Sequence, residues 1–169
     1  MASILQNPGT TMETVAAKML SEFIDYEALL KLGGAFLLAL PIAYNREKAQ
    51  RTAGLRTFPI VAMTACGFLM IGLRFLGGDS EANARLIQGI IGGLGFLGGG
   101  AILKSNGSVS GMATASAIWC AGALGAACAY SQWEVAAALM VGTLITLQFG
   151  PEIKKAVNEN DDKDRPATD

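Results

Sequence analysis

The sequence predicts an all-α, polytopic membrane protein: a bundle of five transmembrane helices preceded by an amphipathic helix on the membrane surface. Composition is the first reason, because 51% of the 169 residues are hydrophobic and only 16% are charged, whereas soluble domains carry about 25% charged residues. The mean hydropathy is accordingly positive, at +0.40. The second reason is that the apolar residues gather into runs of nearly the length, about 20 helical residues, that crosses a bilayer.

Five such runs follow one another, separated by short polar segments. They cover residues 28–44, 57–76, 85–104, 112–130 and 133–149. We therefore expect a transmembrane domain over 28–150, with Pro41 disturbing its first helix. An extracytoplasmic segment, 1–27, precedes this domain, and the helical spacing of the apolar residues in Met12–Ile24 predicts the surface helix. The charged tail, 151–169, is expected to be disordered.

The third run, Arg85–Lys104, has no charge between its basic ends and is rich in glycine. Its glycines are Gly89, Gly92, Gly93, Gly95, Gly98, Gly99 and Gly100. In lipid a glycine lets another helix approach closely. The pairs Gly89/Gly93 and Gly95/Gly99, each four residues apart, therefore predict packing surfaces toward the bundle or toward a second copy of the chain. The closing triplet of glycines is where we expect the helix to bend or unwind.

The same glycines match a dinucleotide-binding fingerprint as a string, Gly93-x-Gly95-x-x-Gly98. That fingerprint needs a preceding strand and an acidic residue about 20 positions later. The flanks here are typical of a membrane helix, and the chain reads Ala117-Ile118-Trp119 near the required acid. Helix packing is therefore the favoured interpretation.

The distribution of lysine and arginine predicts the orientation of the bundle, because basic residues favour cytoplasmic loops. The basic residues near the ends of the runs are Arg46, Lys48, Arg51 and Arg56 after the first run, Lys104 after the third, and Lys154 and Lys155 after the fifth. With five spans these regions share one side. We therefore expect the N-terminus outside and the C-terminus in the cytoplasm of a bacterial inner-membrane protein, with Tyr130 and Trp133 in an outer aromatic belt.

The sequence argues against an enzyme. It has no His, and its cysteines, Cys66, Cys120 and Cys128, lie in apolar runs without a metal-binding spacing, so we interpret them as small buried hydrophobes. No cofactor or nucleic-acid partner is indicated. The spans have no Asp or Glu at their centres, so Asp79 and Glu81 in the second polar loop are only weak candidates for a metal site.

The most concentrated charges are Arg46, Glu47 and Arg56, between the first two runs. Spacing alone favours a topology signal that touches lipid headgroups. The alternative is a docking site in which Glu47 pairs with Arg46 or Arg56.

Three motifs occur together in the order and spacing of a known family. They are Arg46-Glu47 with Ala53–Thr57, the glycine segment Gly93–Leu103, and Gly111–Ala115 (which contains Thr114) followed by Trp119 and Gly125. Over residues 46–147 they resemble the MgtC/SapB family, in a short form without the soluble C-terminal domain of longer members. The chain departs from the family pattern at Asn45, where an acid is usual, at Phe58, where His is common, and at Ala113, a frequent Thr.

The resemblance implies a bacterial inner-membrane protein associated with magnesium limitation and, in some members, with survival inside host cells. One function it implies is non-enzymatic regulation of another membrane complex, with the F-type ATP synthase as a candidate. The alternative is a transporter or permease for magnesium or another cation. The expected partners are the lipid bilayer, another integral membrane protein, and a second copy in a homodimer or higher oligomer. The interaction residues then expected are Arg46, Glu47, Arg56, Gly89, Gly93, Gly95, Gly98, Gly99, Gly100, Thr114 and Trp119.

Overall fold

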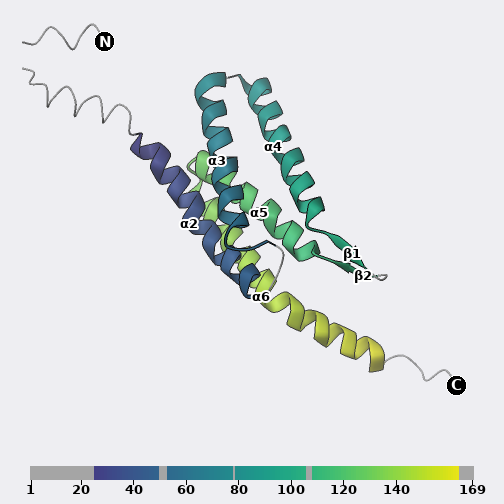
Figure 1. Ribbon diagram of the computed structural model, residues 1–169. Helices are drawn as coiled ribbons and strands as arrows, with labels where there is room; N and C mark the ends of the chain where they lie inside the picture. Colours follow the sequence, from purple (N-terminus) through teal and green to yellow (C-terminus); the bar gives the residue numbers. More distant parts are fainter. Residues whose placement is uncertain (1–24, 50–52, 78, 106–107, 164–169) are drawn as a thin grey trace, which may run out of the picture. The chain divides into compact units, whose positions relative to one another are not determined.

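A computed structural model describes residues 25–49, 53–77, 79–105 and 108–163 (Figure 1). In chain order its elements are α2 (Tyr26–Lys48), α3 (Thr57–Leu76), α4 (Ser80–Gly100), β1 (Leu103–Ser105), β2 (Ser108–Ser110), α5 (Met112–Ala129) and α6 (Trp133–Lys163). The described residues from Lys31 onward belong to one compact unit, and the packing described below lies within it. The surface helix predicted at Met12–Ile24 falls outside the described residues.

Four helical stretches in the described part of the chain are long and apolar enough to cross a membrane. They are Tyr26–Lys48, Thr57–Leu76, Met112–Ala129 and Trp133–Glu152. The prediction of an all-α membrane bundle is thereby confirmed, and these four correspond to four of the five predicted spans. Helix α4 is not among them, because its first turns are polar and its many glycines add little hydropathy.

Helix α4 also has different bounds from the predicted span Arg85–Lys104. It begins at Ser80, because the Asp79 carboxylate caps its first turn, and it ends at Gly100. The amides of Ala101 and Ile102 donate hydrogen bonds to the carbonyls of Gly98 and Gly99, both at 3.1 Å. These bonds join residues three apart, as in a 3₁₀ turn, and they end the helix at the glycine triplet, where a bend was expected.

A short antiparallel hairpin follows, where the sequence predicted the end of a helix and a turn. Strands β1 and β2 pair Leu103 with Ser110 and Lys104 with Val109. Gly111 closes the hairpin with a φ of 89°. A Cβ there would overlap the Ala101 carbonyl oxygen, so only glycine fits this link between α4 and α5.

Two helices are longer than predicted. Helix α2 runs through Pro41 and takes in the loop residues Asn45 to Lys48, which is compatible with the tolerance of membrane helices for proline. Helix α6 continues through Pro151 to Lys163, beyond the domain boundary expected at residue 150. Glu, Lys and Ala dominate the added residues 152–156, and these are good helix formers.

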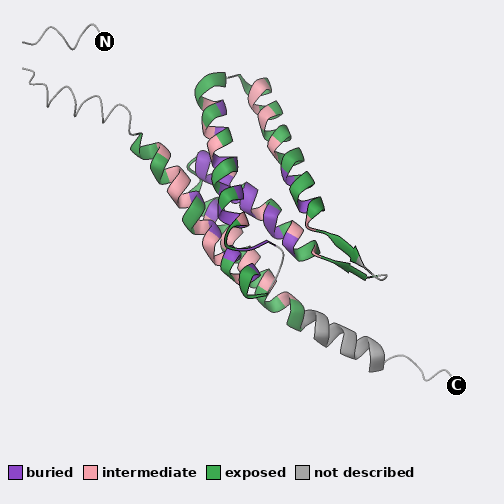
Figure 2. Cartoon of the chain, in the orientation of Figure 1, coloured by how far each residue is buried: buried purple, intermediate pink, exposed green. Residues whose placement is uncertain are grey.

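Helix α5 is the centre of the bundle and contacts α3, α4 and α6. Its buried residues cover more than half of its circumference, as expected of a helix packed between several neighbours. Its exposed face is formed by Met112, Ser116, Trp119 and Ala123. Figure 2 shows that α5 and α4 differ in burial: buried residues occur along the length of α5, whereas α4 is exposed along most of its length. Only Leu94 and Gly98 of α4 are buried.

Two close helix contacts depend on glycines of α5. A Cβ at Gly125 would overlap the carbonyl oxygen of Ala62 in α3 and lie 2.8 Å from its carbonyl carbon. A Cβ at Gly122 would collide with the Leu94 side chain of α4. These two positions bring α3 and α4 against the central helix, which only a residue without a side chain permits.

Candidate functional site

The end of α2 is tied to the start of α3 by a carboxylate. Glu47 Oε2 accepts a hydrogen bond from the Leu55 amide at 3.0 Å. A Cβ at Gly54 would overlap this carboxylate oxygen, so a larger residue there would displace the Glu47 carboxylate from its position on the Leu55 amide. The Gly54 carbonyl in turn accepts from the amides of Thr57 and Phe58, at 3.0 and 3.2 Å, and starts α3.

The two arginines of this loop have different environments. Arg46 is 7% exposed, and its Nη2 donates to Asn45 Oδ1 at 3.0 Å. The carboxamide of Asn45 therefore serves as an acceptor where the family usually has an acid. Arg56 is exposed. Glu47 meets a backbone amide of the loop, which sequence spacing did not indicate.

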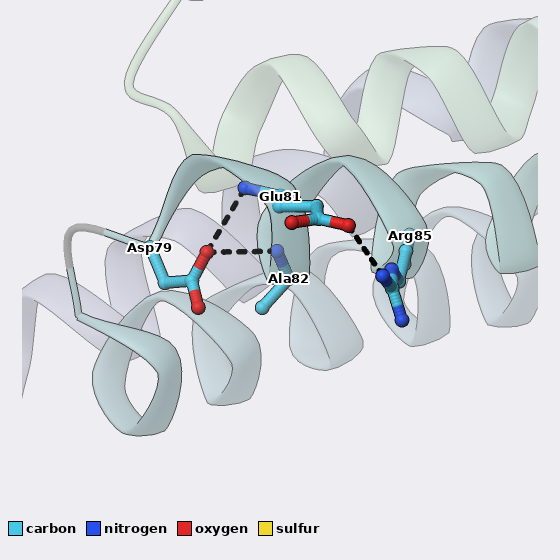
Figure 3. Close-up of polar contacts among 4 residues, drawn as sticks. All are labelled: Asp79, Glu81, Ala82 and Arg85. Atoms are coloured by element: carbon cyan, nitrogen blue, oxygen red, sulfur yellow. Dashed lines mark hydrogen bonds and ion pairs between the residues drawn. The ribbon is translucent and has the colours of Figure 1, made fainter.

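The two acidic metal candidates have structural partners (Figure 3). Asp79 Oδ1 accepts from the amides of Glu81 and Ala82, at 3.0 and 3.1 Å, and so caps α4. Glu81 forms an ion pair with Arg85, one turn along the helix, and both side chains are about three-quarters exposed. Within the described residues, no three His, Cys, Asp or Glu side chains gather as metal ligands.

Most of the glycines in α4 do not contact another helix of the same chain. A Cβ added at Gly89, Gly92, Gly93, Gly95, Gly99 or Gly100 would meet nothing within 4 Å. Gly98 is the exception, because a Cβ there would lie 3.4 Å from the Ala115 carbonyl oxygen of α5. Within the bundle, the predicted packing role of these glycines therefore applies to Gly98.

Glycines of α4 line two grooves instead. The α4–α5 groove has a volume of about 620 Å³, and its lining includes Gly95, Gly98, Gly99, Ser116, Trp119 and Cys120. The α3–α4 groove has a volume of about 560 Å³, and its lining includes Ile60, Phe68, Arg85, Gly89, Gly93 and Leu97. The paired glycines of the sequence thus face two different grooves.

The two remaining predicted residues lie on opposite sides of α5. Thr114 is 1% exposed and belongs to the interior. Trp119 is 45% exposed and lines the α4–α5 groove. The structure therefore brings Trp119 together with Gly95, Gly98 and Gly99, and leaves Thr114 apart from them.

Sequence reasoning missed a polar contact between α5 and α6. Cys120 Sγ and Thr143 Oγ1 lie 2.8 Å apart, and the thiol also reaches the Leu139 carbonyl at 3.5 Å. Interpreting Cys120 as a small hydrophobe overlooked its sulfur as a hydrogen-bonding group between helices. Cys66 and Cys128 are buried, as predicted.

Comparison with known proteins connects these features to one family. The sequence model of the MgtC family matches residues 32–156. Protein SrpB of Synechococcus elongatus is 38% identical over 125 residues, which cover 67% of this chain and 67% of that protein. Protein SapB of Bacillus subtilis is 33% identical over 146 residues, covering 82% of this chain and 63% of SapB.

Protein MgtC of Salmonella typhimurium is 32% identical over 141 residues, covering 83% of this chain and 60% of that protein. The chain thus spans between 60 and 67% of the length of these three relatives. No solved structure matches it. The matched region runs from α2 into α6 and contains the Glu47–Leu55 contact, α4 and the central helix α5. The chain belongs to the MgtC family.

Proposed function

We propose that this protein is a non-enzymatic regulator in the bacterial inner membrane, which acts by binding another integral membrane protein during adaptation to low magnesium. The observation that carries the proposal is the outer face of α4. Phe96 is 83% exposed, and Gly92, Gly95 and Gly99 beside it have no neighbour within 4 Å of an added Cβ. Small residues around one large side chain suit close packing against a helix of another protein.

The proposal also makes α4 a fifth membrane crossing. It follows α3 after residues 77–79 and runs back beside it (Figure 1). Its 21 residues rise about 31 Å. The apolar part from Leu86 to Gly100 accounts for about 22 Å of this rise, and the apolar residues Ala101–Leu103 extend it toward the thickness of a hydrocarbon core. Five crossings put the basic loops on one side and give an outside N-terminus and a cytoplasmic C-terminus.

The partner follows from the resemblance: a membrane complex, with the F-type ATP synthase as the first candidate. A homodimer is the competing occupant of the same face. The test places a photocrosslinking amino acid at Phe96 in cells grown at low magnesium. Ile145 on α6, which is 54% exposed, is the matched control position.

We expect adducts with a defined membrane protein from position 96 and few from position 145. Adducts of twice the chain's mass alone would assign the face to a homodimer. Equal, weak labelling from both positions would refute a partner on α4.

A cation permease is the second candidate, and the α4–α5 groove is the observation that favours it. Ser116 and Cys120 contribute polar atoms to this groove beside three glycines. The carbonyls of Gly98 and Gly99 already accept hydrogen bonds, which makes them weaker cation ligands. Liposomes containing the protein and a magnesium-sensitive dye test this function. Flux above that of empty liposomes would support it, and no flux with correctly inserted protein would exclude it.

A further inference from the structure

The α3–α4 groove has a definite length and two different ends. Helices α3 and α4 are antiparallel, so Phe68 and Arg85 lie toward one end and Ile60 and Leu97 toward the other. From Arg85 to Leu97 the helix rises about 18 Å. The hydrocarbon core of one bilayer leaflet is about 15 Å deep, half of the whole core. The groove is therefore about as long as the hydrocarbon core of one leaflet is thick.

Two of the lining residues that α4 contributes, Gly89 and Gly93, have no side chain, which leaves the α4 side of the groove open. Gly89 and Gly93 are one turn apart on α4, and a Cβ at either would meet nothing within 4 Å. Aliphatic and aromatic side chains form the walls, among them Ile60 and Phe68 of α3 and Leu97 of α4. An α-helix is about 10 Å wide with its side chains, whereas the volume of about 560 Å³ over this length suits a single hydrocarbon chain.

Arg85 stands where the polar part of α4 gives way to the apolar part. The residues before it include Ser80, Glu81 and Asn83, and from Leu86 to Gly100 only Gln88 is polar. The Arg85 side chain is 75% exposed and lines the groove while it binds the carboxylate of Glu81. A guanidinium binds carboxylate and phosphate oxygens through the same N–H donors, so Arg85 can bind a lipid phosphate in place of the Glu81 carboxylate.

We propose that the α3–α4 groove is a specific site for one anionic glycerophospholipid, with its phosphate on Arg85 and one acyl chain over Gly89 and Gly93. The Arg85 guanidinium at one end, a length that matches one leaflet and the narrow apolar lining favour a lipid over a second copy of the chain. Glu81 competes with the phosphate for Arg85 and so weakens the site.

Native mass spectrometry of the detergent-solubilised full chain, titrated with phosphatidylglycerol, tests the site. We expect one retained lipid, bound more tightly than phosphatidylcholine. Arg85→Gln should weaken binding about fivefold, whereas Glu81→Gln should tighten it about twofold because the guanidinium is released. Gly93→Leu should abolish retention by filling the groove. Lys104→Gln, which removes an exposed charge on the hairpin, is the matched control and should leave binding unchanged.

The opposite effects of the Arg85 and Glu81 substitutions separate a headgroup site from a structural ion pair, since loss of the pair alone would move both variants in the same direction. Equal affinity of wild type, Arg85→Gln and Glu81→Gln would overturn the proposal. It would also be overturned if the wild type retained no lipid and formed a dimer that Gly93→Leu disrupts.

Discussion

The contact between Gly125 and Ala62 makes Gly125→Ala a sharp test of the packing. The added methyl group would lie 2.8 Å from the carbonyl carbon and 3.0 Å from the Cα of Ala62. Both are backbone atoms, so no side chain can rotate away and α3 itself must shift. Overpacking of this kind costs up to about 3 kcal/mol, and Ala regains about 1 kcal/mol over Gly in helix propensity.

The net loss is therefore about 2 kcal/mol, which corresponds to a fall in melting temperature of about 4–8 °C for a chain of this size. Thermal unfolding in mild detergent, followed by size-exclusion chromatography, measures it. Gly142→Ala on α6 is the matched control, because a Cβ there meets nothing within 4 Å, and it should melt at or above the wild-type temperature. If both variants melted alike, the close α3–α5 contact would not determine stability.

Substitutions at four further positions probe the loops and the topology. Glu47→Ala removes the acceptor of the Leu55 amide and should cost about 1 kcal/mol in the same melting assay, with Glu47→Gln intermediate; an unchanged melting temperature would contradict the role of the carboxylate. Asp79→Ala should lose about 1 kcal/mol of capping energy, most of which Asp79→Asn restores, and equal melting of the two variants would argue against the cap. A cysteine at position 80 in place of Ser80 should react with an impermeant thiol reagent outside intact cells, whereas one in place of Gln50 should not; the reverse pattern would invert the proposed topology.

The sequence predicts helices well where hydropathy alone determines them. The second span, 57–76, has the bounds of α3, because its apolar run is bordered by polar residues on both sides. The ends of α4 were predicted poorly because local hydrogen bonds decide them. The Asp79 carboxylate starts the helix ahead of the apolar run, and the turn at Gly98 and Gly99 stops it before the run is complete.

The glycines show why a contact is harder to predict than a helix. Gly95 and Gly125 both occur in apolar runs, and composition treats them alike. Which of them meets a neighbour depends on how each helix is rotated about its axis, and only Gly125 faces a backbone. For the same reason the charges of Glu47 and Arg46 were identified from the sequence, whereas the Leu55 amide as a partner was not: that contact depends on the path of the intervening loop.

Helix α6 is longer than a membrane crossing requires. Its apolar stretch ends at Glu152, yet the helix continues to Lys163, and these 11 further residues rise about 16 Å. Headgroups add only about 5–8 Å to each side of the hydrocarbon core. A helix of this length that continued along the membrane normal would carry the chain beyond the headgroup layer.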